Sequence, residues 1–133
     1  MKIAVKLAKK AAKKGEIPVG AVIVKNGKII SKAYNKKETK NDCTKHAEII
    51  AIQKASKKIK NWRLIDCEIY ITMEPCMMCA GAIEQSRISK IIYAVENFNS
   101  GYSTEIKNVE IIKGICEEES KQLVQEFFKK KRS

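Results

Sequence analysis

Two short segments of this chain constrain its fold more than any other feature of the sequence. Residues 75–79 read P-C-M-M-C, and residues 46–48, about thirty positions upstream, read H-A-E. Two thiols at positions i and i+3 in the first turn of a helix lie on the same side of that helix, so both can bind one metal ion. His46, the only histidine, is the candidate for a third ligand. The fold must then bring the two segments together.

Three protein ligands leave the fourth tetrahedral position of a zinc ion open for water, which is typical of a catalytic site. A closed structural site needs a fourth Cys or His at motif spacing, and the sequence has none there. Alone, Cys76 and Cys79 would also fit a redox pair or half of a structural zinc site. A lone histidine is usually a core residue. The combination with Glu48, a carboxylate two residues after His46, favours a catalytic zinc site.

Length and composition predict one globular domain, residues 1–133. The 133 residues are enough to bury a core without disulfides. A hydrophobic share of 44% with 32% charged residues is ordinary for a folded domain. The segment 1–14 is interrupted by lysines and does not resemble a signal peptide, and no apolar run reaches the length of a membrane span. We therefore expect no transmembrane helix, and we expect nucleic acid and not a membrane as the partner.

The five cysteines show no disulfide framework. With Cys76 and Cys79 assigned to a metal, the remaining three are expected to be free thiols. That usage is typical of a reducing compartment and predicts a cytoplasmic protein.

The net charge of +12 predicts an anionic partner, with nucleic acid first and a membrane surface second. All but three of the 27 basic residues are lysines. Such a bias also fits a genome rich in lysine codons, with many lysines only solvating helix faces. Both interpretations of the charge stay open at this point.

Hydrophobic periodicity and turn signals predict an alternation of helices and strands. A first helix carries Ile3, Leu7, Ala8, Ala11 and Ala12 on its apolar face and stops at Gly15. An Asn-Gly turn at 26–27 joins two strands, and 35–44 is a loop. The further predicted elements are a helix from about 46, a strand at 68–72, a helix from the cysteines to about 87, strands at 90–95 and 109–112, and a helix at 116–131. This alternation predicts an α/β fold, one mixed sheet with helices on both faces.

Together, the two segments match the H-x-E…P-C-x-x-C signature of zinc nucleobase deaminases. The chain resembles the cytidine deaminase-like superfamily and, within it, the bacterial tRNA adenosine deaminases. The resemblance covers nearly the whole chain and is carried by E-I-P-V-G-A-V at 16–22, Y-N at 34–35, Asp42, Thr44, H-A-E at 46–48, N-W-R-L-I-D at 61–66, E-P-C-M-M-C-A-G-A at 74–82, S-R-I at 86–88 and F-F at 127–128.

The resemblance implies a three-layer α/β/α fold with a mixed five-stranded sheet of order 2-1-3-4-5, and a homodimer. It implies hydrolysis of adenosine to inosine at the wobble position of the anticodon, with a tRNA anticodon stem-loop as partner. It also implies roles for six residues: zinc ligands His46, Cys76 and Cys79, the proton shuttle Glu48, Asn35 as a hydrogen-bond partner of the flipped base, and Val19 as a wall of the pocket.

The chain departs from the family's pattern near the site. Cys43 stands where the family has proline, Lys45 where it has a small residue, and the segment 96–108 is shorter and lacks an Asn-His pair. Asn97 stands where the family usually carries an aspartate beside the sugar of the target nucleotide. We hypothesise that this asparagine weakens discrimination between ribose and deoxyribose. The alternative is that Asn97 belongs to the shortened loop and does not meet the sugar.

Two other functions stay open from the sequence. The first is a deaminase of a free base or nucleoside, of the guanine or cytosine type, which would use the same zinc site without a basic surface. The second is a zinc-stabilised RNA-binding subunit without activity. The presence of Glu48 argues against the second, because such a subunit has no chemical need for that carboxylate.

Overall fold

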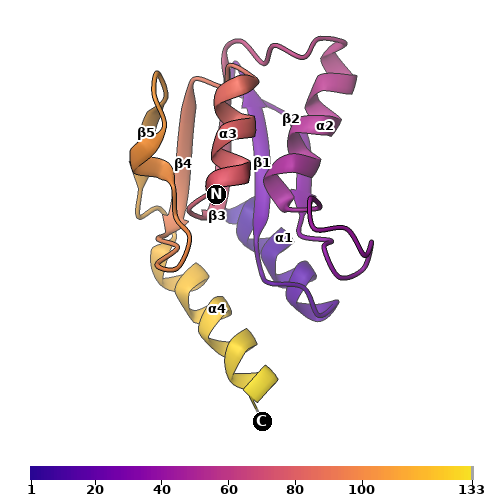
Figure 1. Cartoon of the computed structure of the whole chain (residues 1–133), viewed down its shortest axis with the longest axis vertical. Helices are drawn as coiled ribbons and strands as arrows, with labels where there is room; N and C mark the ends of the chain where they lie inside the picture. The colour runs from indigo at the N-terminus through magenta and orange to yellow at the C-terminus, as the bar shows by residue number, and fades with distance from the viewer. Residues whose placement is uncertain (133) are drawn as a thin grey trace.

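The computed structural model describes residues 1–132, without the side chains of residues 104 and 132. Within that range, five strands form one sheet and helices pack on both of its faces (Figure 1). The elements in chain order are α1 (Lys2–Lys13), β1 (Gly20–Lys25), β2 (Lys28–Tyr34), α2 (Ala47–Ile59), β3 (Cys67–Met73), α3 (Met77–Gln85), β4 (Lys90–Val95), the short 3-10 helix η1 (Ser103–Glu105), β5 (Glu110–Lys113) and α4 (Glu117–Arg132). The predicted elements are all present, with ends displaced by one or two residues.

The sheet is mixed and its strands follow the order β2-β1-β3-β4-β5. β1 runs antiparallel to both β2 and β3, whereas β3, β4 and β5 are parallel. Asn26 and Gly27 both have positive φ angles, 50° and 80°, as the favoured two-residue hairpin turn requires. The α/β fold and the strand order implied by the resemblance are confirmed.

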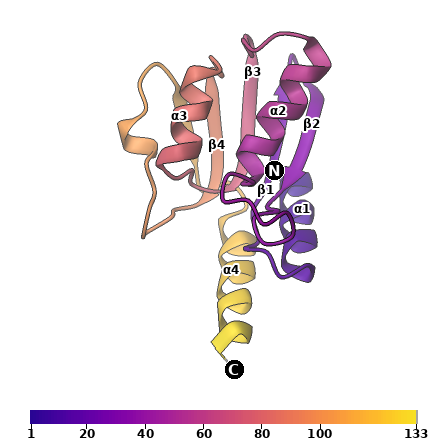
Figure 2. The same ribbon diagram turned by 45° about the vertical axis from the view of Figure 1, so that its right-hand side comes forward.

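Two helices cover each face of the sheet (Figure 2). α2 and α3 pack side by side on one face, and α1 and α4 pack together on the other. One cluster of buried side chains lies between the sheet and helices α2 and α3, with Ile23, Ile69, Ile71 and Ile91 fully buried. Within residues 1–132, no helix has both the length and the apolar character that a membrane crossing requires.

The face of α1 that contacts the sheet agrees only in part with the predicted one, since Ala8 and Ala11 are buried as expected. Ile3, which we expected on that face, is 41% exposed, and the buried residues of the helix are Ala4, Val5, Ala8 and Ala11. The reason lies at Gly20 on β1, where a Cβ atom would overlap the carbonyl oxygen of Ala4 and lie 2.9 Å from the backbone nitrogen of Ala8. The helix backbone comes so close to the strand that only small side chains fit between them.

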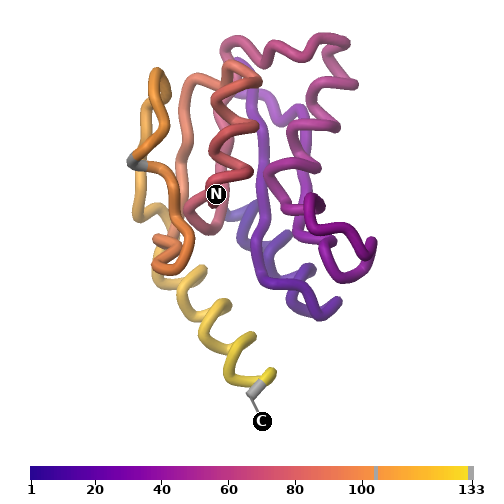
Figure 3. The backbone as a smooth tube through the Cα atoms, in the orientation of Figure 1, coloured from indigo at the N-terminus to yellow at the C-terminus, as the bar shows by residue number. Residues whose placement is uncertain are grey.

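The ends of several elements meet at one edge of the sheet. β3 and β4 are parallel and end there, and α2 and α3 begin there (Figures 1 and 3). The connecting segments after β2 and after β4 lie at the same edge (Figure 3). In open α/β sheets, ligands bind at the carboxyl ends of parallel strands. This edge is therefore where a functional site is expected.

Candidate functional site

The first turns of α2 and α3 bring one imidazole and two thiols together. His46 is the N-cap of α2, and Cys76 is the N-cap of α3. The Nδ1 atom of His46 lies 3.8 Å from Sγ of Cys76 and 3.4 Å from Sγ of Cys79. All three ligand atoms lie within 4.8 Å of one another. A tetrahedral zinc with ordinary bond lengths separates its N and S ligand atoms by about 3.6 Å. The group is therefore arranged to bind a metal ion.

The protonation of this group also suits a metal. Hydrogen bonds with Cys79 and with His46 lower the pKa of Cys76 to about 3. The contact with Cys76 in turn raises the pKa of Cys79 and that of His46. Thiolate is the form in which cysteine binds metals. One of the two thiols is thus a thiolate at neutral pH, and a bound cation would deprotonate the other.

Glu48 lies beside these ligands and is not one of them. Its side chain is almost fully buried, and burial raises its pKa to about 7. The cause is the loss of solvation of the charged form, and an adjacent cation would oppose it. A carboxyl group that changes protonation near neutral pH, within a pocket, is suited to carry protons during a reaction.

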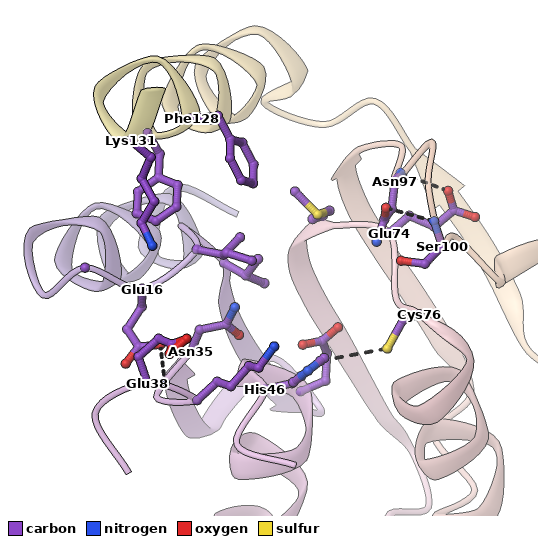
Figure 4. Close-up of a pocket in the computed structure, with 17 residues that line it drawn as sticks. Glu16, Asn35, Glu38, His46, Glu74, Cys76, Asn97, Ser100, Phe128 and Lys131 are labelled. Atoms are coloured by element: carbon purple, nitrogen blue, oxygen red, sulfur yellow. Dashed lines mark hydrogen bonds between the residues drawn. The ribbon is translucent and has the colours of Figure 1, made fainter. Parts of the chain in front are cut away.

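A cavity of ≈ 270 Å³ opens beside the ligand group (Figure 4). His46, Glu48 and Cys76 line it, while Cys79 is buried beneath it. The three residues named from the resemblance as substrate contacts also line the cavity: Val19, Asn35 and Asn97. The tertiary fold thus brings all of the candidate residues to one site, from five separate elements and loops.

Asn35 has a structural task that its sequence position did not reveal. Its Oδ1 atom accepts a hydrogen bond of 2.8 Å from the backbone N–H of Ala47, the first residue of α2. The backbone N–H of Asn35 donates to the carbonyl oxygen of Val19 at 3.1 Å. Asn35 therefore satisfies a free N–H group at the start of the helix that carries His46 and Glu48. Its amide NH₂ group is left to donate toward the cavity.

Glu74 organises the segment after β4, and we did not predict this from the sequence. Its carboxylate accepts hydrogen bonds from the backbone N–H groups of Asn97, at 3.2 Å, and Ser103, at 3.1 Å, and from the Ser103 hydroxyl. Gly101 forms a bridge with Cys76, so the same segment touches a metal-ligand candidate. The position of Glu74, directly before Pro75 and Cys76, was the only hint in the sequence that it has a role. No neighbouring residue indicated which groups its carboxylate would bind.

The side chain of Asn97 takes part in that segment. Its Oδ1 atom accepts a hydrogen bond of 3.2 Å from the backbone N–H of Ser100, and both residues line the cavity. Figure 4 shows Asn97, Glu74 and Ser100 gathered on the α3 side of the cavity. The amide NH₂ of Asn97 remains able to donate, which an aspartate could not do.

Glu16 holds the opposite wall of the cavity. It is buried, and its carboxylate accepts hydrogen bonds from the backbone N–H groups of Glu38 and Thr39 and from the Thr39 hydroxyl. Burial opposes its charged form, but the three hydrogen bonds outweigh that effect and lower the pKa of Glu16. The loop after β2 is thereby fastened to the end of α1.

Helix α4 closes the cavity from the far end of the chain. Phe127, Phe128 and Lys131 line it, and the Lys131 ammonium lies 5.3 Å from the centre of the Phe127 ring (Figure 4). The sequence predicted the helix and its apolar face, but not that this face would reach the site.

Known proteins resemble the whole chain. The model of the MafB19-like deaminase family matches residues 1–132. The tRNA-specific adenosine deaminase of Bacillus subtilis is 40% identical over 142 residues, covering 99% of this chain and 88% of that protein. The alignment is longer than the chain, so this relative has residues that the chain lacks.

Two solved structures share the fold. A structure from a study of A-to-I editing by tRNA:A34 deaminases at the wobble position of transfer RNA has a TM-score of 0.87 and 32% identity, and the match covers 92% of this chain and 96% of that one. The guanine deaminase of Bacillus subtilis has a TM-score of 0.71 and 42% identity over 82% of this chain and 68% of that one.

Proposed function

Because this chain belongs to the family of the tRNA-specific adenosine deaminases, within the MafB19-like deaminases, we propose that it is a zinc-dependent hydrolase that converts adenosine to inosine at the wobble position of a tRNA anticodon. The observation that carries the proposal is the His46, Cys76 and Cys79 group beside a buried carboxylate, at the wall of a cavity. The relatives named for this activity cover the chain nearly end to end.

In this proposal, zinc is held by Nδ1 of His46 and the thiolates of Cys76 and Cys79. When bound there, the ion would lower the pKa of a coordinated water to about 7 and so supply hydroxide at neutral pH. The separations of the ligand atoms and the depressed pKa of Cys76 support this assignment.

Glu48 is the proton carrier in the proposed reaction. It accepts one proton of the attacking water as oxygen adds to C6 of adenine and passes it to the ring nitrogen, and it then carries the second proton, from the added hydroxyl group, to the departing amine. Ammonia leaves and inosine remains. The position of Glu48 in the first turn of α2, two residues from His46, supports this role.

Asn35 and Val19 would hold the flipped base, and Asn97 would lie near its sugar. The amide NH₂ of Asn35 is the donor that its contact with Ala47 leaves available. The cavity of ≈ 270 Å³ lies near the lower end of the usual range for ligand pockets, as one base requires.

A free-base deaminase is the second candidate, because the guanine deaminase of Bacillus subtilis is 42% identical over the matched part. That match covers a smaller share of both chains than the match to the tRNA-specific relative does. The net charge of +12 also favours an anionic substrate.

We further propose that residues 1–133 form one deaminase domain, that two chains form a homodimer, and that the protein works in the cytoplasm. The single sheet, with helices packed on both of its faces, supports the single domain. The family resemblance implies the homodimer, and the free cysteines, which are typical of a reducing compartment, support the cytoplasm. Light scattering would test the dimer, which should have twice the 15.0 kDa mass of one chain.

The decisive experiment measures ammonia release and inosine from the zinc-loaded protein with several substrates. We expect turnover of a tRNA anticodon stem-loop with adenosine at the wobble position, and little turnover of adenosine, guanine or cytidine. Faster turnover of guanine would establish the second candidate. RNA binding without turnover of any substrate would establish an inactive RNA-binding subunit.

A further inference from the structure

Three lysines surround the side chain of Tyr34 at the free edge of the sheet. β2 is an edge strand, and Tyr34 is its last residue. Three ammonium groups lie 5.0 to 5.4 Å from the centre of the Tyr34 ring, those of Lys10, Lys14 and Lys36. The ammonium group of Lys14 also donates a hydrogen bond of 3.0 Å to the Tyr34 hydroxyl.

A fourth lysine joins them from the other face of the sheet. Lys54 of α2 donates a hydrogen bond of 3.0 Å to the carbonyl oxygen of Lys32 on β2. Burial and the charges of Lys36 and Lys10 lower its pKa. We call Lys10, Lys14, Lys36 and Lys54 the Tyr34 lysine cluster. Its lysines come from the end of α1, the chain after β2, and α2, and Figure 2 shows these elements next to one another.

The cluster has no acidic partner among the side chains that the structure describes. Among those described side chains, Lys90 and Lys113 form ion pairs, and both lie outside the cluster. The charged groups that act on the Tyr34 hydroxyl are again the lysines of the cluster. Like charges held together without a counter-charge repel one another, and a bound anion would remove that repulsion. Lysine ammonium groups are common ligands of phosphate.

The cluster and the cavity share one stretch of chain. Tyr34 and Lys36 belong to the cluster, whereas Asn35 and Lys37 line the cavity. In extended chain, successive side chains point to opposite sides. Asn35 is the immediate neighbour of Tyr34 and Lys36 in the chain. A ligand that fills the cavity and extends past Asn35 would therefore reach the ammonium groups of the cluster.

We propose that the Tyr34 lysine cluster binds backbone phosphates of the RNA strand next to the target nucleotide. This inference rests on the proposed function, since it takes RNA as the substrate. RNA fits better than an anionic lipid surface because residues 34–37 supply both Tyr34 and Lys36 of the cluster and Asn35 and Lys37 of the cavity that would take up the base. The cluster thus sets the path of the strand into the site.

The test compares two variants of the zinc-loaded full chain. The first carries Lys10→Gln, Lys14→Gln and Lys36→Gln. The matched control, Lys28→Gln with Lys57→Gln and Lys58→Gln, removes the same charge from exposed positions at the other ends of β2 and α2. Binding to a labelled anticodon stem-loop is measured by fluorescence anisotropy at several salt concentrations. We expect the slope of log affinity against log salt to become less steep by about 0.7 to 0.9 for each lost contact in the cluster variant only.

Equal slopes for the two variants, or a cluster variant with the wild-type slope, would overturn the inference. So would loss of binding to vesicles of anionic phospholipid with the RNA slope unchanged. Melting temperature and zinc content check the fold, and Lys36→Gln alone, which leaves α1 intact, repeats the test if the triple variant unfolds. Because binding is measured without turnover, a protein that binds RNA through the cluster but makes no inosine would refute the proposed function alone.

Discussion

Glu48 combines near-complete burial with a position two residues from the metal-ligand candidate His46. Glu48→Gln keeps the size of the side chain and removes its ability to carry protons. We expect zinc content and melting temperature to stay at the wild-type level, while inosine formation falls by at least about 10²-fold. Steady-state kinetics and metal analysis on the same sample measure both. Turnover within a few-fold of the wild type would remove Glu48 from the mechanism.

Asn97 presents an amide to the cavity where the family usually has an aspartate. Its Oδ1 atom is used by the backbone N–H of Ser100, which leaves the NH₂ group for a ligand. An aspartate would keep the turn, accept a hydrogen bond from a ribose 2′-OH and repel phosphates. We expect Asn97→Asp to raise the ratio of deamination efficiency on an RNA hairpin to that on the matched DNA hairpin. A ratio that does not move would mean that the residue does not read the sugar.

At the scale of elements, the segment after β4 depends on the absence of a side chain at Gly101. A Cβ atom there would overlap the Glu74 carboxylate and lie 2.6 Å from the carbonyl oxygen of Asn97. Gly101→Ala should displace this segment from Glu74, raise KM for the stem-loop and lower the melting temperature. Gly81→Ala, on α3, is the matched control, since a Cβ atom there meets nothing within 4 Å and alanine favours a helix. Equal effects of the two substitutions would contradict the role given to Gly101.

The ionised carboxylate of Glu16 fastens the loop after β2. Because the pKa of Glu16 is lowered in the folded protein, its charge stabilises the fold above the unfolded pKa. That contribution is lost as pH falls through the folded pKa. Glu16→Gln should therefore be less stable than the wild type at neutral pH, and the difference should shrink in acid. Urea unfolding of both proteins between pH 7 and pH 3 measures it. If the difference in the free energy of unfolding between the two proteins does not change with pH, the charge of Glu16 does not stabilise the loop.

At the scale of the molecule, the proposed metal ion would link the first turns of the two helices on one face of the sheet. Three ligand candidates come from the first turns of α2 and α3. Since ligation energy is also folding energy, Cys79→Ser should lose both zinc and several degrees of melting temperature. A chelator should act on the wild type in the same way. Cys43→Ser, at an exposed thiol outside the ligand group, should change neither. Full zinc occupancy in Cys79→Ser would refute the ligand set.

Local patterns were enough to predict the elements and the pair of thiols, whereas joining His46 to that pair rested on the match to a known signature. The Asn26-Gly27 turn, the apolar periodicity of α4 and the spacing of Cys76 and Cys79 each act through neighbours a few residues away. Backbone sterics and helix geometry therefore determine them before any tertiary contact forms. The strand order came from the resemblance to a family and not from periodicity.

The tertiary structure alone decided how distant residues serve one site. The side chain of Asn35 accepts a hydrogen bond from the backbone N–H of Ala47, and the carboxylate of Glu74 accepts one from the backbone N–H of Asn97. Helix α4, at the end of the chain, lines the cavity. Because α1 lies so close to Gly20, small residues of the helix are buried against the sheet, and Ile3 is left exposed. These contacts depend on how helices pack on a particular sheet and on distances between backbones. Residue type and local spacing do not determine the distances between packed backbones. The same sequence pattern is therefore compatible with several packing arrangements.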